Sequence, residues 1–263
     1  MKILILGAGK MGKFFCDLLS DRGHEMAIFD IDPRRLLYTF NCRRFGTPEE
    51  IEEFRPDLVI NAATVKYTIP AFERVMAYLP EGAMLSDIAS VKTGLPEYYA
   101  SCGHRFVSTH PMFGPTFASL SNLSNENAII ISEGDAAGRE FFRDLYESLG
   151  LNIADYTFAE HDLTTSYTLS LPFVSTFLFV EGMDRQDVPG TTFNRHLAIA
   201  RGLLGEDDFL LQEILFNPNT PARLEEMARA LDRLRHLIAA RDAEGLRAHL
   251  SHLRAILSSQ PGH

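Results

Sequence analysis

The sequence has few cysteines and no excess of positive charge, and each shortage excludes a class of protein. Its three cysteines, Cys16, Cys42 and Cys102, are widely spaced and form no C-x-x-C pair, which is typical of reduced thiols and not of disulfides or metal ligands. The formal net charge of −10 argues against nucleic acid or an anionic membrane as a partner. We therefore expect a cytoplasmic protein without a bound metal.

Long apolar runs are also missing where an export signal or a membrane span would need them. Near the N-terminus, Ile3 to Leu6 is far shorter than a signal-peptide core and is followed by glycine. The longest apolar segment elsewhere, Leu169 to Val180, contains Pro172 and polar residues, and it falls short of the ~20 residues that span a membrane. The sequence predicts neither a targeting signal nor a membrane span.

The first half of the chain alternates apolar strand-like segments with helical segments. Strands are expected at Lys2–Leu6, Glu25–Phe29, Leu58–Ala62, Met84–Ile88, Arg105–Thr109, Ala128–Ser132 and Asn152–Ala154. Such alternation is typical of an α/β fold with a doubly wound, mainly parallel Rossmann sheet. In that fold, ligands bind beyond the carboxyl ends of the strands.

The second half is expected to be all-helical, because apolar residues recur there with helical spacing. Helices are expected at Glu160–Gly182, Thr191–Leu204, Asp207–Phe216, Pro221–Arg241 and Ala243–Leu257. The 263 residues suffice for two domains with separate cores. We place the boundary near residue 155, between a nucleotide-binding domain (1–155) and a helical domain (156–263).

Four phenylalanines of the helical half are candidates for an apolar surface that this half cannot bury by itself: Phe173, Phe177, Phe179 and Phe193. A homodimer would cover such a surface. The alternative, that these rings form only the core of one chain, stays open.

A glycine motif of the form G-x-G-x-x-G follows directly on the first expected strand. Its first glycine permits a tight bend, its second lets a pyrophosphate approach the backbone, and its third lets helix and strand pack closely. The phosphates would lie at the N-terminus of the next helix. The residues that we predict to hold them are Gly7, Gly9, Lys10, Met11 and Gly12.

Asp30 ends the second expected strand, where a dinucleotide-binding fold places an acid. An acid there accepts hydrogen bonds from both ribose hydroxyls and repels a 2′-phosphate, so NAD is favoured over NADP. Arg34 and Arg35 follow closely and could compensate a 2′-phosphate, which leaves NADP open. Asp30 could also simply cap the turn around Asp32.

Polar residues stand at the ends of two later strands. Ser90 and Lys92 follow the fourth strand and are expected to face the crevice. His110 follows the fifth strand, in a loop flanked by proline and glycine. A histidine, with an ordinary pKa of about 6.5, suits a base that takes a hydroxyl proton while hydride leaves the same carbon. We predict His110 as that base and Ser90 as the group that orients it, with a loop residue and a helix cap as the structural alternatives.

Three further motifs, standing in this order behind the glycine motif, carry a resemblance: Asp87-Ile88-Ala89-Ser90-Val91-Lys92, His110-Pro111-Met112-Phe113-Gly114-Pro115 and Glu160-His161-Asp162. With them the chain resembles the prephenate dehydrogenase family over nearly its whole length. The glycine motif is common to many dehydrogenases, whereas the other three are specific to this family. The resemblance implies an NAD-dependent oxidative decarboxylation of prephenate to 4-hydroxyphenylpyruvate in tyrosine biosynthesis.

The resemblance also implies roles for single residues. His110 would accept the proton of the ring hydroxyl, with Ser90 on the same hydroxyl. Lys92 would help to hold the loop, the cofactor or the substrate, or would be an ordinary solvated lysine. The His161-Asp162 pair is expected to be structural, at the start of a helix.

The substrate's carboxylates need local positive charge in so acidic a protein, preferably a guanidinium. Arg195 is the first candidate, because it lies on a helix where the family places such an arginine. Arg201 is the second candidate, and an exposed helical arginine is the alternative for both.

The chain departs from the family at Phe173, where many members have the second histidine of Ser-His-Leu-Pro-His and this sequence has Ser-Leu-Pro-Phe. The loss of both histidines favours an alternative substrate, arogenate or another cyclohexadienyl acid. A further alternative is a catalytically silent NAD-binding dimer that acts as an interaction protein. Binding alone would not require His110 together with Ser90, which argues against this alternative.

Overall fold

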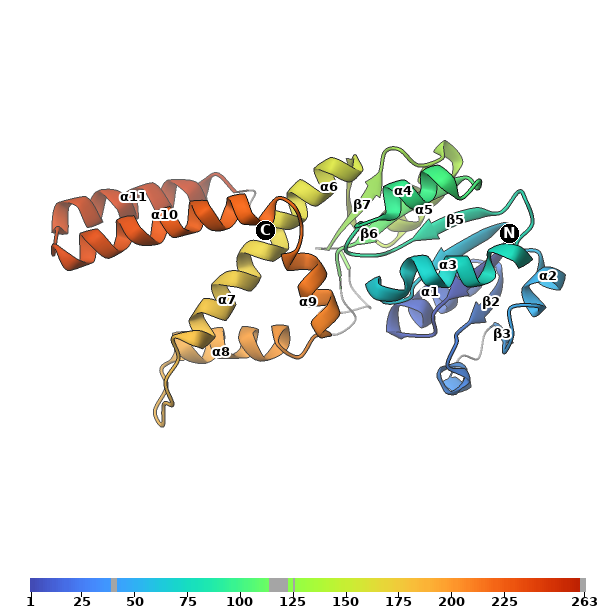
Figure 1. Ribbon diagram of the computed structural model, residues 1–263, viewed down its shortest axis with the longest axis horizontal. Helices are drawn as coiled ribbons and strands as arrows, with labels where there is room; N and C mark the ends of the chain where they lie inside the picture. The colour runs from blue at the N-terminus through green and yellow to red at the C-terminus, as the bar shows by residue number, and fades with distance from the viewer. Residues whose placement is uncertain (39–41, 114–122, 125, 261–263) are drawn as a thin grey trace. The chain divides into compact units, whose positions relative to one another are not determined.

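The structure is a computed structural model that describes residues 1–38, 42–113, 123–124 and 126–260 (Figure 1). The chain divides into two compact units. Unit 1 comprises Met1–Thr165 and Leu204–Ile214, and unit 2 comprises Ser166–Leu203 and Leu215–His263. Unit 1 extends beyond residue 155 because helix α6 (Phe158–Thr165) packs on the last two strands of the sheet. The domain boundary near residue 155 stays a prediction.

Unit 1 is built on one eight-stranded sheet in the order β3-β2-β1-β4-β5-β6-β7-β8. Its strands are β1 (Lys2–Leu6), β2 (Glu25–Phe29), β3 (Arg43–Phe45), β4 (Leu58–Asn61), β5 (Met84–Asp87), β6 (Phe106–Pro111), β7 (Asn127–Ile131) and β8 (Asn152–Tyr156). All neighbours pair in parallel except β6 and β7, which are antiparallel. The chain begins at β1, winds outward to β3 and returns to β4 on the other side, so the predicted doubly wound sheet is confirmed.

Helices cover both faces of this sheet, because successive side chains of a strand point to opposite faces. Ile3 and Ile5 of β1 join one apolar cluster, with residues of α1 and α5, and Leu4 and Leu6 join a second cluster, with residues of α2, α3 and α4. The helices are α1 (Lys10–Asp21), α2 (Glu50–Phe54), α3 (Thr68–Val75), α4 (Leu95–Ser101) and α5 (Ala136–Ser148). The remaining helical segments of unit 1 are η1 (Pro33–Tyr38), η2 (Val65–Tyr67), η3 (Met76–Tyr78) and α9 (Asp208–Leu215).

The regular secondary structure of unit 2 is all helical in its described residues, as the sequence predicts. It consists of the π-helical turn η4 (Ser166–Ser170) and the helices α7 (Leu171–Glu181), α8 (Thr191–Leu203), α10 (Thr220–Ala239) and α11 (Ala243–Ser258). The long helices α10 and α11 lie side by side as a hairpin (Figure 1). Helix α10 is joined to η4 where Thr220 Oγ1 donates to Ser170 Oγ over 2.9 Å.

The sequence predicts no membrane span, but the described residues contain one helical run, Phe158–Glu181, that is long and apolar enough to form one. By length and composition alone it could cross a membrane, with a mean hydropathy of 1.3 in its most apolar window and 17% of that window buried. Pro172 does not end the run, and it lies in the first turn of α7 directly after the π-helical turn η4. One such helix decides little, since core helices of soluble proteins have the same composition.

Candidate active site

The predicted cofactor and catalytic residues of unit 1 lie along one edge of the sheet. The glycine turn follows β1, Asp30 follows β2 and Ser90 follows β5. His110 lies at the end of β6, which runs parallel to β5. Because carboxyl ends of parallel strands meet at the same edge, these residues are neighbours across the end of the sheet.

The surroundings of each glycine in the turn agree with the role that the G-x-G-x-x-G motif predicts for it. Gly7 has φ +96°, and an added Cβ would meet backbone atoms of Ala62 and Ala63 at 3.0–3.1 Å. A Cβ on Gly12 would lie 1.9 Å from the Gly7 carbonyl oxygen, so only glycine lets α1 approach the turn. A Cβ on Gly9 would meet nothing within 4 Å, which is the open side that an approaching pyrophosphate needs.

The start of α1 is suited to an anion. Gly9 caps the helix without any side-chain hydrogen bond, and the first turn contains no acid, so its backbone N–H groups and the helix dipole favour a negative ligand. Lys10 is exposed at this end, whereas Met11 packs against the apolar cluster beside α1.

Asp30 is buried and joins the glycine turn to the end of β2. Its Oδ2 accepts from the Ala8 N–H at 2.7 Å, and its Oδ1 accepts from the Asp32 N–H at 2.8 Å. The turn-capping role is therefore real, and it leaves each carboxylate oxygen with capacity for a further donor such as a ribose hydroxyl. Arg34 forms a two-point ion pair with Asp32, which lowers the pKa of Asp32 to about 2. Its guanidinium is thus held beside an acid.

Lys92 corrects a sequence expectation, because it does not face a crevice and has no exposed surface. Its ammonium donates to Asp87 Oδ2 and, over 2.7 Å, to the Thr109 carbonyl. Asp87 also accepts from the Tyr99 hydroxyl at 2.8 Å. Burial lowers the pKa of Lys92, and Asp87 opposes that shift. The ammonium is therefore engaged inside the protein, where it fixes the carbonyl that immediately precedes His110.

The sequence predicted His110 in a loop after the fifth strand, but His110 lies within β6. The antiparallel pairing of His110 with Ile129 prolongs this strand. Gly114 and Pro115 of the same motif lie outside the described residues. The imidazole is 5% exposed. Burial first, and then the neighbouring His161 and Lys92, hold the pKa of His110 well below its usual range, so the ring is neutral at pH 7.

His161, which the sequence reasoning expected to be structural, lies next to His110. His110 Nδ1 lies 3.0 Å from His161 Nε2, and His161 Nδ1 lies 3.2 Å from Asp162 Oδ1. His161 is fully buried, whereas the Asp162 side chain is 29% exposed. Burial lowers the pKa of His161, and Asp162 opposes this. The sequence signal was the His-Asp pair itself, on the helix that follows the last strand.

Ser90 is half-buried in the bend after β5. Within the described residues its hydroxyl makes no hydrogen bond with His110, so the orienting contact predicted for Ser90 is made by His161. A hollow of about 200 Å³ opens next to this bend, lined among others by Lys66, Thr93 and Phe209.

Arg195 and Arg201, the predicted carboxylate ligands, lie on α8 of unit 2. Both are exposed, and neither forms an ion pair within the described part of the chain. Six positions along a helix place them about 120° apart around its axis, so they do not form one joint anion site. Phe173 lies half-buried on α7.

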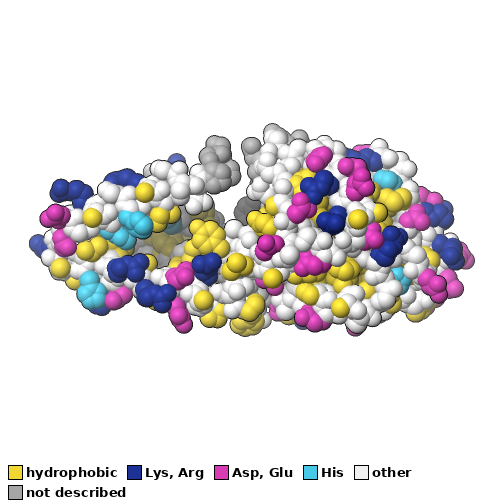
Figure 2. Space-filling view, turned by 90° about the horizontal axis from the view of Figure 1, so that it is seen from above, with side chains coloured by type: hydrophobic (Ala, Val, Ile, Leu, Met, Phe, Trp, Pro, Cys, Tyr) yellow, Lys and Arg dark blue, Asp and Glu magenta, His cyan; other side chains and the backbone are white. Residues whose placement is uncertain are grey.

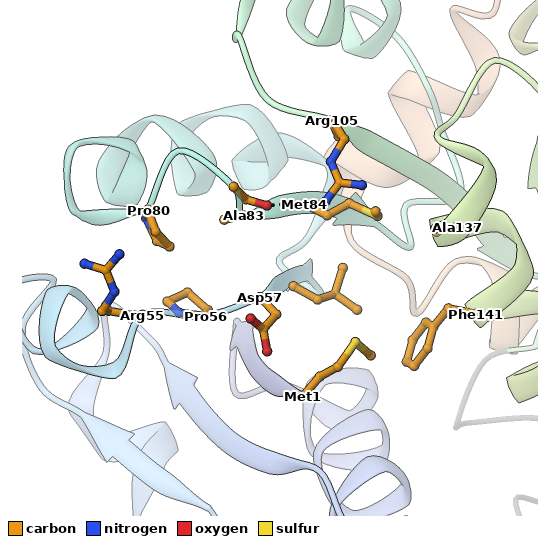
Figure 3. A pocket seen from close by; sticks show the side chains of 13 residues that line it. Met1, Arg55, Pro56, Asp57, Pro80, Ala83, Met84, Arg105, Ala137 and Phe141 are labelled. Atoms are coloured by element: carbon orange, nitrogen blue, oxygen red, sulfur yellow. Dashed lines mark hydrogen bonds between the residues drawn. The ribbon is translucent and has the colours of Figure 1, made fainter.

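A larger hollow lies at the opposite edge of the sheet, where β4, β5 and β6 begin. Its volume is about 450 Å³, and it contains none of the predicted site residues. Figure 3 shows Arg55, Arg105 and Phe141 around it. Among the described residues, no group of three His, Cys, Asp or Glu side chains could hold a metal ion.

The fold and this edge define a Rossmann-type nucleotide-binding protein. Residues 33–154 match the family model described as "Prephenate dehydrogenase, nucleotide-binding domain". This part of the chain is thus similar to the nucleotide-binding domain of the prephenate dehydrogenase family, and the resemblance seen in the sequence is confirmed.

Two curated relatives are similar to the chain. A probable arogenate/prephenate dehydrogenase of Methanocaldococcus jannaschii is 24% identical over 92% of this chain and 57% of its own length. The T-protein of Haemophilus influenzae is 27% identical over 67% of this chain and 43% of its own length. The chain thus spans about half the length of the curated relatives that it matches.

Two solved structures share the fold at low sequence identity. Prephenate dehydrogenase from A. aeolicus, in complex with hydroxyphenyl propionate and NAD⁺, has a TM-score of 0.82 and 23% identity, covering 98% of this chain and 97% of that one. Synechocystis arogenate dehydrogenase has a TM-score of 0.78 and 19% identity, covering 98% and 99%. The agreement over both units supports the two-part architecture.

Proposed function

We propose that the protein is an NAD-dependent prephenate dehydrogenase that converts prephenate to 4-hydroxyphenylpyruvate in tyrosine biosynthesis. The observation that carries the proposal is a buried, neutral histidine, His110, at the same sheet edge as a glycine turn with an open second glycine. The match of residues 33–154 to the nucleotide-binding domain of this family supports it. None of the three cysteines forms a disulfide in the described residues, which is consistent with a cytoplasmic protein.

The cofactor is proposed to lie on the glycine turn, with its pyrophosphate over Gly9 and the start of α1. Asp30 would accept the ribose hydroxyls of NAD. The acids Asp30 and Asp32 disfavour the 2′-phosphate of NADP, and the guanidinium of Arg34 is already paired with Asp32. NADP is therefore only the alternative cofactor. NAD, when bound, accepts the hydride from the hydroxyl-bearing carbon.

His110 takes the proton of the substrate hydroxyl. Because the pKa of His110 is lowered by burial, the ring is unprotonated and ready to accept at neutral pH. Ser90, half-buried at the neighbouring strand end, is proposed to bind the same hydroxyl oxygen. One hydride and one proton leave the alcohol, and loss of carbon dioxide makes the ring aromatic.

Arg195 is proposed to bind a carboxylate of the substrate, with Arg201 as the second candidate. A guanidinium with no acidic partner among the described residues is available for a bidentate contact. Lys92, which has no exposed surface, is proposed to act by fixing the carbonyl before His110. Its role as a direct substrate ligand is therefore the weaker proposal.

Arogenate, or a related cyclohexadienyl acid, is the second candidate substrate. Phe173 stands where the resemblance expects a histidine, and an apolar ring offers no hydrogen bond to a substrate side chain. Helical residues 156–263 are proposed to bind the substrate and to form a homodimer, since they bury few of their apolar side chains.

Purified protein mixed with NAD and prephenate, with arogenate in parallel, tests the proposal by the absorbance of NADH. Turnover of prephenate supports it, and turnover of arogenate alone replaces the substrate. His110→Asn is expected to lose turnover and to retain NAD affinity. Silence with both substrates, under NAD and NADP alike, would overturn the dehydrogenase proposal and favour the interaction protein.

A further inference from the structure

The two ring nitrogens of His110 are not equivalent, and only one can face a substrate. Nδ1 is engaged with His161 Nε2 at 3.0 Å. The nitrogen left to accept a hydroxyl proton is therefore Nε2. It can accept only if the single proton of the neutral ring resides on Nδ1, so a base at this position needs something that fixes its tautomer.

Asp162 supplies that constraint through His161. An ionised carboxylate can only accept hydrogen bonds, so the contact of 3.2 Å between Asp162 Oδ1 and His161 Nδ1 requires a proton on His161 Nδ1. In a neutral His161, Nε2 then carries a lone pair. His110 Nδ1 must donate to that lone pair, which leaves His110 Nε2 as the acceptor.

The charged groups around the pair keep both rings neutral, as this chain of donors requires. Burial and the Lys92 ammonium lower the pKa of both histidines. Asp162 and, more weakly, Asp87 act in the opposite sense on His161. A protonated His161 would donate from both nitrogens and would reverse the tautomer of His110.

We propose that His161 and Asp162 are positioning residues that hold His110 in its Nδ1–H tautomer and so leave Nε2 free to take the substrate's hydroxyl proton. The inference rests on the proposed function only for the identity of that substrate. In the step, the O–H bond of the hydroxyl breaks and an N–H bond forms at His110 Nε2, while both Nδ1–H bonds remain intact.

The same contacts stabilise the imidazolium that forms. Protonated His110 donates from Nδ1 to His161, whose own Nδ1–H is polarised by the Asp162 carboxylate. A carboxylate that orients a catalytic histidine and stabilises its cation acts in this way in serine proteases. Here a second imidazole would extend the distance over which the carboxylate acts.

The tautomer of His110 can be read directly in ligand-free protein. Long-range ¹H–¹⁵N correlation spectra of ¹⁵N-histidine-labelled protein, assigned with His110→Asn, are expected to show the Nδ1–H form in the wild type. Asp162→Asn presents an amide that can donate to His161, which permits the reversed chain. We expect this variant to populate the Nε2–H form of His110 and to lower kcat by about 10²-fold to 10⁴-fold.

A purely structural role for His161 and Asp162 would not produce that pattern. KM for prephenate and the affinity for NAD are expected to stay within about threefold, because neither residue is proposed to touch a ligand. His161→Gln, whose side-chain oxygen can accept from His110 Nδ1, should keep the tautomer and at least tenfold more kcat than His161→Leu. Glu160→Gln, on the same helix, is the matched control and should keep the wild-type tautomer and kcat.

The outcomes separate this inference from the proposed function. The Nε2–H form in wild-type protein, or an Asp162→Asn variant with unchanged tautomer and kcat, would overturn the inference while turnover of prephenate persists. The expected tautomers in a protein that oxidises neither prephenate nor arogenate would overturn the proposed function and support the positioning role. Circular dichroism of each variant checks that it is folded, and His161→Gln carries the test if Asp162→Asn is not.

Discussion

Unit 1 and unit 2 differ in how many of their apolar side chains they bury. Unit 1 has two large clusters of buried side chains, one on each face of its sheet. In the described residues of unit 2, the one buried apolar side chain is the small Ala200. The comparison teaches that unit 1 buries most of its apolar side chains in its own core, whereas unit 2 leaves most of its apolar side chains half-buried or exposed.

Helices α7 and α11 are among the elements of unit 2 that carry these half-buried and exposed apolar side chains. Helix α7 is apolar on all its sides and yet has no buried residue, and a helix of that composition is usually covered. Helix α11 presents a stripe of exposed Leu250, Leu253 and Leu257, the last of them 72% exposed. Figure 2 shows apolar side chains among charged ones over α10 and α11. A second copy of the chain is the partner that we propose for these faces.

Removing a large side chain should harm unit 1 far more than unit 2. Phe72 is fully buried in unit 1, so Phe72→Ala is expected to lower the free energy of unfolding by about 3–5 kcal/mol. The exposed Leu257 is the matched position, and Leu257→Ala in dilute protein should change it by no more than about 0.5 kcal/mol. Urea titrations measure both. Equal losses would contradict the comparison.

Unit 1 should be nearly as sensitive to the loss of its buried charge. Lys92→Met leaves the fully buried Asp87 carboxylate without its cation, which is expected to cost about 3–5 kcal/mol. Adding Asp87→Asn should restore part of that loss, because the second change removes the unpaired charge. Thermal unfolding of the single and double variants checks the order. A double variant less stable than Lys92→Met would show that the pair is not coupled in this way.

Charge introduced on α11 should act on association and not on the fold of unit 1. Leu253→Glu combined with Leu257→Glu is expected to raise the Kd of the homodimer by at least about tenfold, because each leucine that is covered contributes about 1.5–3 kcal/mol. Sedimentation over a range of concentrations measures it. Ser251→Glu on the same helix is the control for added charge. A wild-type chain that stays monomeric at every concentration would refute the proposed cover.

Acidification should weaken unit 1 through its two buried histidines. Both pKa values are lowered by burial, so below about pH 6.5 the unfolded chain binds protons that the folded chain does not. The free energy of unfolding therefore falls as the pH drops, by about 1.4 kcal/mol per pH unit for each histidine, until the folded-state pKa is reached.

Urea titrations between about pH 5 and pH 7 measure that slope. His110→Asn should reduce it, because one of the two protons is no longer bound on unfolding. Carboxylates with lowered pKa values, such as Asp32 and Glu49, lose their contribution only at lower pH. An unchanged slope in His110→Asn would contradict the assignment.

Local pattern predicted most of the sheet and missed its shortest strand. The first two strands match their predicted bounds, Lys2–Leu6 and Glu25–Phe29, because continuous apolar runs next to turns are strong signals. Strand β3 (Arg43–Phe45) was missed, since three residues with two exposed arginines carry no periodicity. The glycine turn was found because its geometry depends on residues close in sequence.

The partners of the catalytic candidate were harder to predict because they come from distant parts of the chain. Lys92 was taken for a solvated or ligand-binding residue, and its burial depends on Asp87 and on the Thr109 carbonyl of the next strand. His161 reaches His110 only because α6 packs on β7 and β8, beside β6. No spacing pattern in the sequence predicts the contact between His161 and His110.

The path of the chain between the two units has a consequence for how such a protein can be taken apart or recombined. The chain leaves unit 1 after Thr165, returns for Leu204–Ile214 and leaves again. The returning segment brings Phe209 to 5.6 Å from the Lys66 ammonium of unit 1. No single cut, by a protease or at a gene junction, therefore yields a whole unit, and exchange of one unit between relatives requires three splice points.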